Sequence, residues 1–206
     1  MSIARSDASE PGSGDSHDRF GSTKGNEILT STTGVVLLGL LIAEGVTIVE
    51  IGGLAGAHMF IGLALIPPVV VKLAATGYRS FRYFTGSRTY TAIGPPRFPL
   101  RLMAPPFVAL MLAVLVTGVL LMARGNKAGT LLEIHKVSFI VWLAFFGVHV
   151  LAYLPRAVRL AWRDWHPAPR GALPGLGIRN LLLLGAVGGG AALAIALLPT
   201  IENWHP

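Results

Sequence analysis

Five long apolar runs dominate the sequence and leave few folds open to it. They cover about residues 28–51, 58–83, 105–122, 131–153 and 180–199. Each run approaches or exceeds the roughly 20 residues that a helix needs to cross the hydrocarbon core of a bilayer. The sequence therefore predicts an all-α integral membrane bundle of about five transmembrane helices. We expect Pro67-Pro68 to kink the second helix, and the fourth helix to be able to continue to Trp165.

The polar ends of the chain complete this prediction of its organisation. Residues 1–27 are rich in Ser, Gly, Asp and Arg and are expected to form a disordered cytoplasmic tail. Residues 28–200 form the transmembrane domain, and residues 201–206 are expected to be a short external tail. Within the fifth run, Gly188-Gly189-Gly190 is expected to allow close helix packing. The absence of cysteine excludes disulfides and thiolate metal sites within the chain.

The basic residues predict the orientation. The chain has 17 Lys and Arg and a formal net charge of +7. Five arginines lie within residues 79–101, five more within residues 156–179, and three basic residues lie in the N-terminal tail, against three on the opposite side. Because positively charged loops stay in the cytoplasm, we expect a multi-pass protein of a bacterial cytoplasmic membrane, with its N-terminus cytoplasmic and its C-terminus external. This topology alone explains the positive charge, and we expect membrane lipid as a partner and no nucleic acid.

Polar residues inside the apolar runs are the candidates for function, since they are costly in a membrane. His58 and Lys72 are 14 residues apart on the second run, and His135 and His149 are 14 apart on the fourth. Fourteen residues bring two side chains back to nearly the same helix face, about 21 Å apart along the axis. Since both helices cross in the same direction, His58 is expected at the depth of His135, and Lys72 at the depth of His149. Glu44 is a further buried polar residue, on the first run.

Paired histidines at one depth on facing helices suit the two axial positions of a haem iron. His58 and His135 meet this requirement near the outer surface. Gly62, one turn from His58, is expected to leave room for the porphyrin, and Lys136 is placed to reach a haem propionate. Each histidine, taken singly, also has an ordinary interpretation as an interfacial residue. Glu44 can be a proton or quinol group or a partner for a polar neighbour.

This arrangement resembles the transmembrane cytochrome b superfamily, whose four-helix core carries histidines about 14 residues apart on two helices. The resemblance implies that His58, His135 and His149 stand at three of four haem-ligand positions, with Lys72 at the fourth. It implies at least one b haem, and a second if Lys72 ligates iron; otherwise Lys72 is a charge for a propionate or a quinone. At finer grain, about residues 34–155 are similar to a group of uncharacterised bacterial membrane proteins. That likeness lies in Glu44-Gly45-Val46-Thr47, the segment around Lys72, Thr76-Gly77-Tyr78-Arg79, Arg82-Tyr83-Phe84-Thr85-Gly86, Gly94-Pro95-Pro96 and His135-Lys136.

Three functions follow as hypotheses. The first is a b-type membrane cytochrome that relays electrons between the quinone pool and an external oxidoreductase subunit, acting as a relay or anchor rather than as a stand-alone enzyme. The second is a haem-free structural or assembly subunit, or a small transporter, with a buried network of Glu44, Lys72 and His149. The third is a ferric-reductase-like protein, which needs two haems and is disfavoured by Lys72 at the fourth ligand position.

Overall fold

The computed structural model describes residues 23–92, 94, 98–125, 129–166 and 176–204. The disorder predicted for residues 1–22 lies outside this part of the chain. The described residues form five long helices and two short ones: α1 (Thr23–Val49), α2 (Ile51–Phe84), α3 (Arg88–Thr91), α4 (Phe98–Arg124), α5 (Gly129–Trp165), α6 (Leu176–Ala196) and α7 (Leu198–Glu202).

The five long helices confirm the all-α membrane bundle. Each of them is long and apolar enough to cross a bilayer. Their outward faces carry large apolar side chains such as Val116, Ile140 and Leu184, which are 55%, 65% and 70% exposed. In water such a surface would be unstable, whereas in a bilayer it contacts lipid tails.

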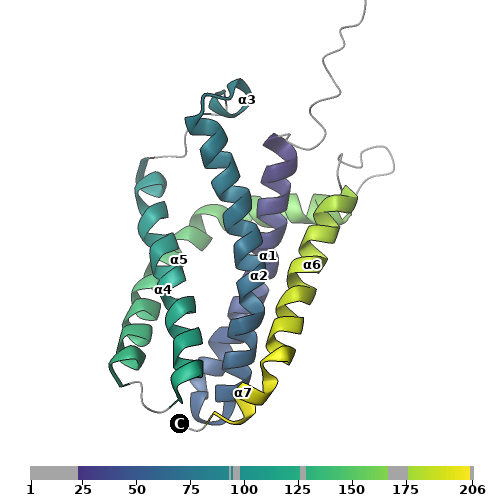
Figure 1. Ribbon diagram of the computed structural model, residues 1–206. Helices are drawn as coiled ribbons and strands as arrows, with labels where there is room; N and C mark the ends of the chain where they lie inside the picture. The colour runs from purple at the N-terminus through teal and green to yellow at the C-terminus, as the bar shows by residue number, and fades with distance from the viewer. Residues whose placement is uncertain (1–22, 93, 95–97, 126–128, 167–175, 205–206) are drawn as a thin grey trace, which may run out of the picture.

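The contacts among α1, α2, α4 and α5 close into a ring. Figure 1 shows α6 on one side of the bundle, with α4 and α5 on the other. Going round the ring, α1 contacts α2 and α5, and α5 contacts α4, while α4 and α2 make the fewest contacts of the four adjacent pairs. α6 packs along α2. The predicted four-helix core is therefore α1, α2, α4 and α5. We call its two ends the His58 end and the Lys72 end, after the residues of α2 that lie near them.

Helical structure extends into the inner ends of both predicted tails. α1 begins at Thr23, so residues 23–27 are helical. They are fixed because the Asn26 side chain donates to the Ala75 carbonyl over 3.0 Å and the Glu27 carboxylate pairs with Arg156. At the other end, α7 folds back onto the bundle, and Ile201 is only 7% exposed in an apolar cluster with Leu63, Met122 and Ala194.

The helices also extend beyond the predicted spans. α2 starts at Ile51, directly after α1, and its kink lies at Leu54, where φ is −115° and ψ is 16°. Helical angles continue through Pro67 and Pro68, so the kink expected there stays a prediction. Two glycines, Gly52 and Gly53, precede Leu54, and glycine favours helices poorly.

α5 continues to Trp165, as the sequence allowed. Figure 1 shows α5 bending and then running across the bundle behind α1 toward the start of α6. Pro155 lies inside this helix, and a proline removes a backbone donor and commonly bends a helix. The far end of α5 is held by Asp164, whose buried carboxylate pairs with the buried guanidinium of Arg179 on α6.

Candidate functional site

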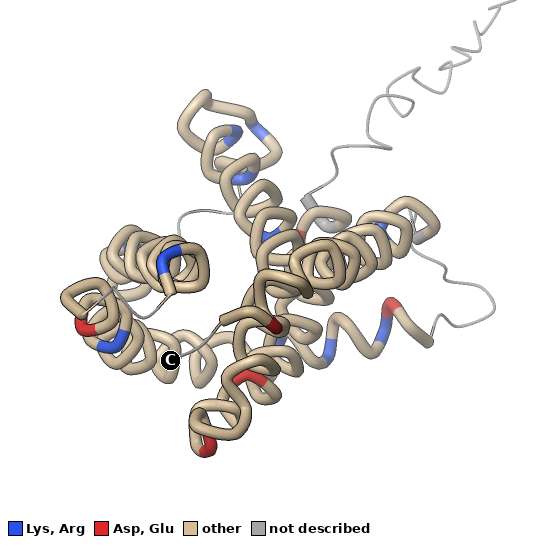
Figure 2. Tube along the Cα trace, turned by 60° about the horizontal axis from the view of Figure 1, so that its bottom comes forward, with Lys and Arg blue, Asp and Glu red and all other residues tan. Residues whose placement is uncertain are grey.

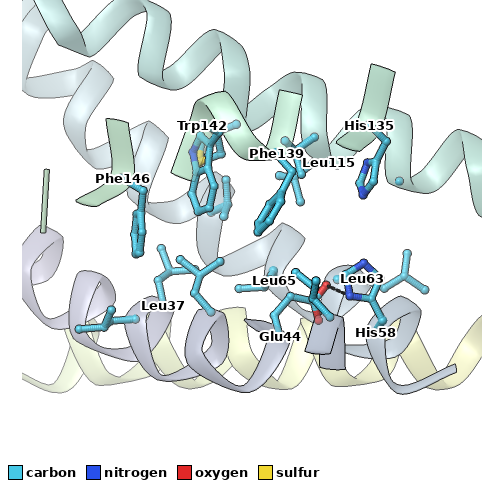
Figure 3. A pocket seen from close by; sticks show the side chains of 18 of the residues that line it. Leu37, Glu44, His58, Leu63, Leu65, Leu115, His135, Phe139, Trp142 and Phe146 are labelled. Atoms are coloured by element: carbon cyan, nitrogen blue, oxygen red, sulfur yellow. Dashed lines mark ion pairs between the residues drawn. The ribbon is translucent and has the colours of Figure 1, made fainter. Parts of the chain in front are cut away.

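A cavity of about 430 Å³ lies inside the ring of four helices. Pockets of this size hold cofactors and drug-sized ligands. Most of its lining is apolar, and Figure 3 shows aromatic side chains from α5 facing aliphatic ones across it. The five polar residues singled out from the sequence all line this one cavity: Glu44, His58, Lys72, His135 and His149. The structure thus brings together groups that lie on three different helices.

The imidazole of His58 is held by two side chains of α1. Its Nδ1 lies 3.1 Å from Glu44 Oε1 and 3.0 Å from Thr47 Oγ1. The Thr47 hydroxyl donates its one hydrogen to the Glu44 carbonyl over 2.6 Å. A hydroxyl with its hydrogen so engaged can only accept from the ring. Both partners of His58 Nδ1 are therefore acceptors, and Nδ1 carries the proton.

His135 is held in a matching way by α4. Its Nδ1 lies 2.9 Å from Thr117 Oγ1. The Thr117 hydroxyl donates to the Ala113 carbonyl over 2.6 Å, so it too accepts from the ring. In both histidines the proton lies on Nδ1, which leaves the lone pair on Nε2. Among the described residues, neither Nε2 has a side-chain hydrogen-bond partner, and the Val114 backbone of α4 is a further partner of the His135 ring.

The two rings face each other across the cavity. Their centroids are 6.5 Å apart and their planes make an angle of 86°. Since a ligating imidazole nitrogen lies about 2 Å from its metal, two imidazoles on opposite sides of one ion have centroids about 6 Å apart. The predicted match in depth between His58 and His135 is confirmed.

Two glycines make these approaches possible. A Cβ on Gly62 would lie 3.3 Å from Glu44 Oε1, so Gly62 leaves room for the carboxylate that holds His58. A Cβ on Gly118 would lie 3.3 Å from His135 Cε1, so Gly118 lets the His135 ring lie against α4. Both glycines line the cavity. Gly62 was expected to make room for a porphyrin, and its closest neighbour here is Glu44.

At the other end of the cavity, the surroundings of Lys72 and His149 differ from those of His58 and His135. Lys72 Nζ donates to the Thr30 carbonyl over 2.9 Å, and a Cβ on Gly34 would lie 2.8 Å from this amine. The His149 ring stacks on Phe107, with centroids 4.9 Å apart, and lies 4.9 Å from the Tyr153 ring. No hydrogen bond from the His149 ring occurs within the described part of the chain.

Lys136 lies at the rim of the cavity. Its amine is 3.3 Å from the carboxylate of Glu133, and the two side chains are 55% and 68% exposed. Such an exposed pair contributes little to stability, so the amine remains able to bind another anion.

Several site residues were missed by the sequence interpretation. Thr47, Thr117 and Gly118 hold or seat the histidines, and Trp142 and Trp204 line the cavity with buried indole nitrogens that have no partner among the described residues. The sequence did offer one indication of a role for Thr117, because it is the single polar side chain between residues 105 and 122. Nothing in the sequence shows which ring it meets.

The described residues contain no group of three or more His, Cys, Asp or Glu side chains placed to hold a metal ion. No family model matches the chain, and neither a curated protein nor a solved structure is significantly similar to it.

Proposed function

We propose that this protein is a b-type membrane cytochrome that holds one haem between His58 and His135. The observation that supports this most is that two imidazoles, 6.5 Å apart across a cavity, both have Nδ1 hydrogen-bonded to acceptors. Nε2 is the nitrogen left to ligate, and a metal-binding histidine characteristically donates its other ring N–H to a carboxylate, hydroxyl or carbonyl.

Haem fits this pair of ligands better than a bare metal ion. Structural and catalytic zinc sites use three or four protein ligands, and the described residues offer only two here. A porphyrin supplies four ligands to its iron and needs two more from the protein. The apolar walls around the pair suit the rest of a porphyrin ring, and Lys136 at the rim is placed to pair with a propionate.

The residues around the histidines set how strongly they ligate. Thr47 and Thr117 fix the orientation and the tautomer of each ring. The Glu44 carboxyl group also lies beside His58 Nδ1, so the two proposed ligands have different surroundings. When bound, a haem supplies reversible one-electron exchange at iron, and the protein tunes it through ligation, hydrogen bonds and burial.

The proposed role is electron relay between the quinone pool and a redox partner outside a bacterial cytoplasmic membrane. The His58 end would then be external, consistent with the distribution of arginines in the sequence. A second haem between Lys72 and His149 is less well supported, because the Lys72 amine already donates to the Thr30 carbonyl and the His149 ring stacks against Phe107.

The test is an absorption spectrum of the detergent-purified protein, oxidised and reduced, with extraction to count haem per chain. We expect one b haem per chain, a His135→Ala variant that lacks the reduced b-type bands, and an unchanged His166→Ala control, since His166 is exposed outside the cavity. A colourless protein from haem-replete cells, or an unchanged spectrum in well-folded His135→Ala, would refute the assignment.

A further inference from the structure

The half of the cavity toward the Lys72 end contains hydrogen-bond donors without matching acceptors. Trp142 lines it at mid-depth, seven residues from His135 and seven from His149, which is about 10 Å along the helix in each direction. Trp142 is only 6% exposed, and its indole Nε1 is buried with no hydrogen-bond partner among the described residues. An indole can only donate.

Leaving this donor unpaired is costly in a membrane. A buried polar group without a partner is destabilising, and a bilayer core offers no water to replace the partner. Trp142 is also far from the helix ends, where lipid headgroups could accept its hydrogen. The position of this indole therefore points to an acceptor that comes with a ligand.

Lys72 adds a second donor to the same cavity. Its amine makes one hydrogen bond, to Thr30, and an ammonium group has three N–H bonds. In the described part of the chain no carboxylate forms an ion pair with it. Lys72 thus has donors to spare at about the depth of His149, roughly 10 Å from the level of Trp142.

Stacked aromatic rings line the space between these two donors. The Trp142 ring stacks on Phe107, with centroids 6.0 Å apart and planes 16° apart, and on Phe146, at 4.8 Å and 20°. Aliphatic side chains of α1 and α2, among them Leu37 and Leu65, face this aromatic wall (Figure 3). An apolar, aromatic-lined space with a donor toward each end suits a ring with acceptor oxygens on opposite edges.

We propose that this half of the cavity binds the ring of a lipid-soluble quinone, with one oxygen accepting from Trp142 Nε1–H and the opposite oxygen accepting from the Lys72 ammonium. A six-membered ring with a hydrogen bond of about 3 Å at each end is about as long as the roughly 10 Å between the levels of Trp142 and Lys72 along the helices. The choice of a quinone over another ring with acceptor oxygens rests on the proposed electron relay, whereas binding itself does not require haem.

The test measures binding of 2,3-dimethyl-1,4-naphthoquinone to the full-length protein in detergent by equilibrium dialysis. We expect Trp142→Phe, which keeps an aromatic ring and removes the N–H, to weaken binding about five- to tenfold, the usual size of one hydrogen bond. Lys72→Met should have a similar effect and serves as the second variant if Trp142→Phe folds poorly. The matched control is Trp162→Phe, on the same helix, 63% exposed and outside the cavity lining.

A second probe, 2,3-dimethylnaphthalene, has the same ring without the oxygens, and its binding should be equal in wild type and Trp142→Phe. The proposal is overturned if the naphthoquinone does not bind, or if its affinity is the same in the Trp142, Lys72 and Trp162 variants. Counting haem in the same preparations separates this proposal from the cytochrome assignment. A colourless protein with Trp142-dependent binding keeps the quinone site and removes the haem, whereas a haem protein with Trp142-independent binding does the reverse.

Discussion

Two threonines determine the orientation and the tautomer of the two facing histidines. An isolated histidine in a membrane helix can have either tautomer and any of several orientations. Here Thr47 and Thr117 have committed their hydroxyl hydrogens to backbone carbonyls of their own helices, so each must accept from the neighbouring imidazole. Each histidine is thus oriented by a helix other than its own, His58 by α1 and His135 by α4.

At this scale we expect Thr117→Val to weaken haem binding. Valine has nearly the same shape but cannot accept the Nδ1–H of His135, and losing such an outer partner costs about 10–100-fold in affinity at metal sites. The measurement is the rate at which the purified protein loses haem to an excess of apomyoglobin. Thr117→Ser keeps the hydroxyl and should behave nearly as wild type. Equal rates in the valine and serine variants would contradict the role assigned to this hydroxyl.

The sequence predicted the histidine pair but not the residues that hold it. His58 and His135 could be placed at one depth because depth follows from residue count along straight helices of known rise. The partner of a side chain depends instead on how each helix is rotated about its axis, and the sequence of one helix does not contain this. The expected partners of Lys136 and Gly62 were uncertain for the same reason. Lys136 contacts Glu133, and a Cβ on Gly62 would contact Glu44.

At the scale of elements, a glycine controls the contact between α2 and α6. A Cβ on Gly190 would overlap the carbonyl oxygen of Ala64, so the backbones meet without a side chain between them. Gly188-Gly189-Gly190 was predicted to allow close packing, and the structure shows that Gly190 makes the contact. Gly188 and Gly189 have open space where a Cβ would be.

We therefore expect Gly190→Ala to destabilise the docking of α6, whereas Gly189→Ala should not. The added methyl cannot be accommodated without moving a backbone, and overpacking of this kind costs typically about 1–3 kcal/mol. Thermal unfolding of the two variants in detergent, followed by circular dichroism, compares them directly. Similar midpoints for both would mean that the helices separate without cost and that this contact does not hold α6.

Helix ends were the least predictable elements, and the reason is physical. Hydropathy detects the stretch that must lie in hydrocarbon, but a helix can continue beyond it for other reasons. α1 begins earlier because Asn26 and Glu27 bind α2 and α5. α7 exists because Ile201 has an apolar cluster to join. Neither of these partners is close in sequence, so no local pattern could have placed those boundaries.

At the scale of the whole molecule, basic residues gather toward the Lys72 end, and acidic residues neutralise them in one part of that end but not in another. Figure 2 shows Lys and Arg along the projecting end of α2 and α3 with no acidic residue among them, and the sequence has no Asp or Glu between residues 51 and 132. Near the end of α5 the arginines are partly neutralised, since Arg156 pairs with Glu27 and Arg179 pairs with Asp164. The arginines of the α2–α3 projection therefore have no acidic neighbours, whereas two of those near the far end of α5 are paired.

This distribution predicts the orientation in the membrane, and the chain is convenient for testing it because it has no cysteine. We expect a cysteine at Thr89, beside the projecting arginines, to react with a membrane-impermeant maleimide only after the cells are permeabilised. A cysteine at Thr130, exposed at the opposite end of the bundle, should react in intact cells. Positive loops remain on the cytoplasmic side because moving them across an energised membrane is unfavourable. The reverse labelling pattern would put the His58–His135 pair near the cytoplasmic face, so an external redox partner could no longer be its neighbour.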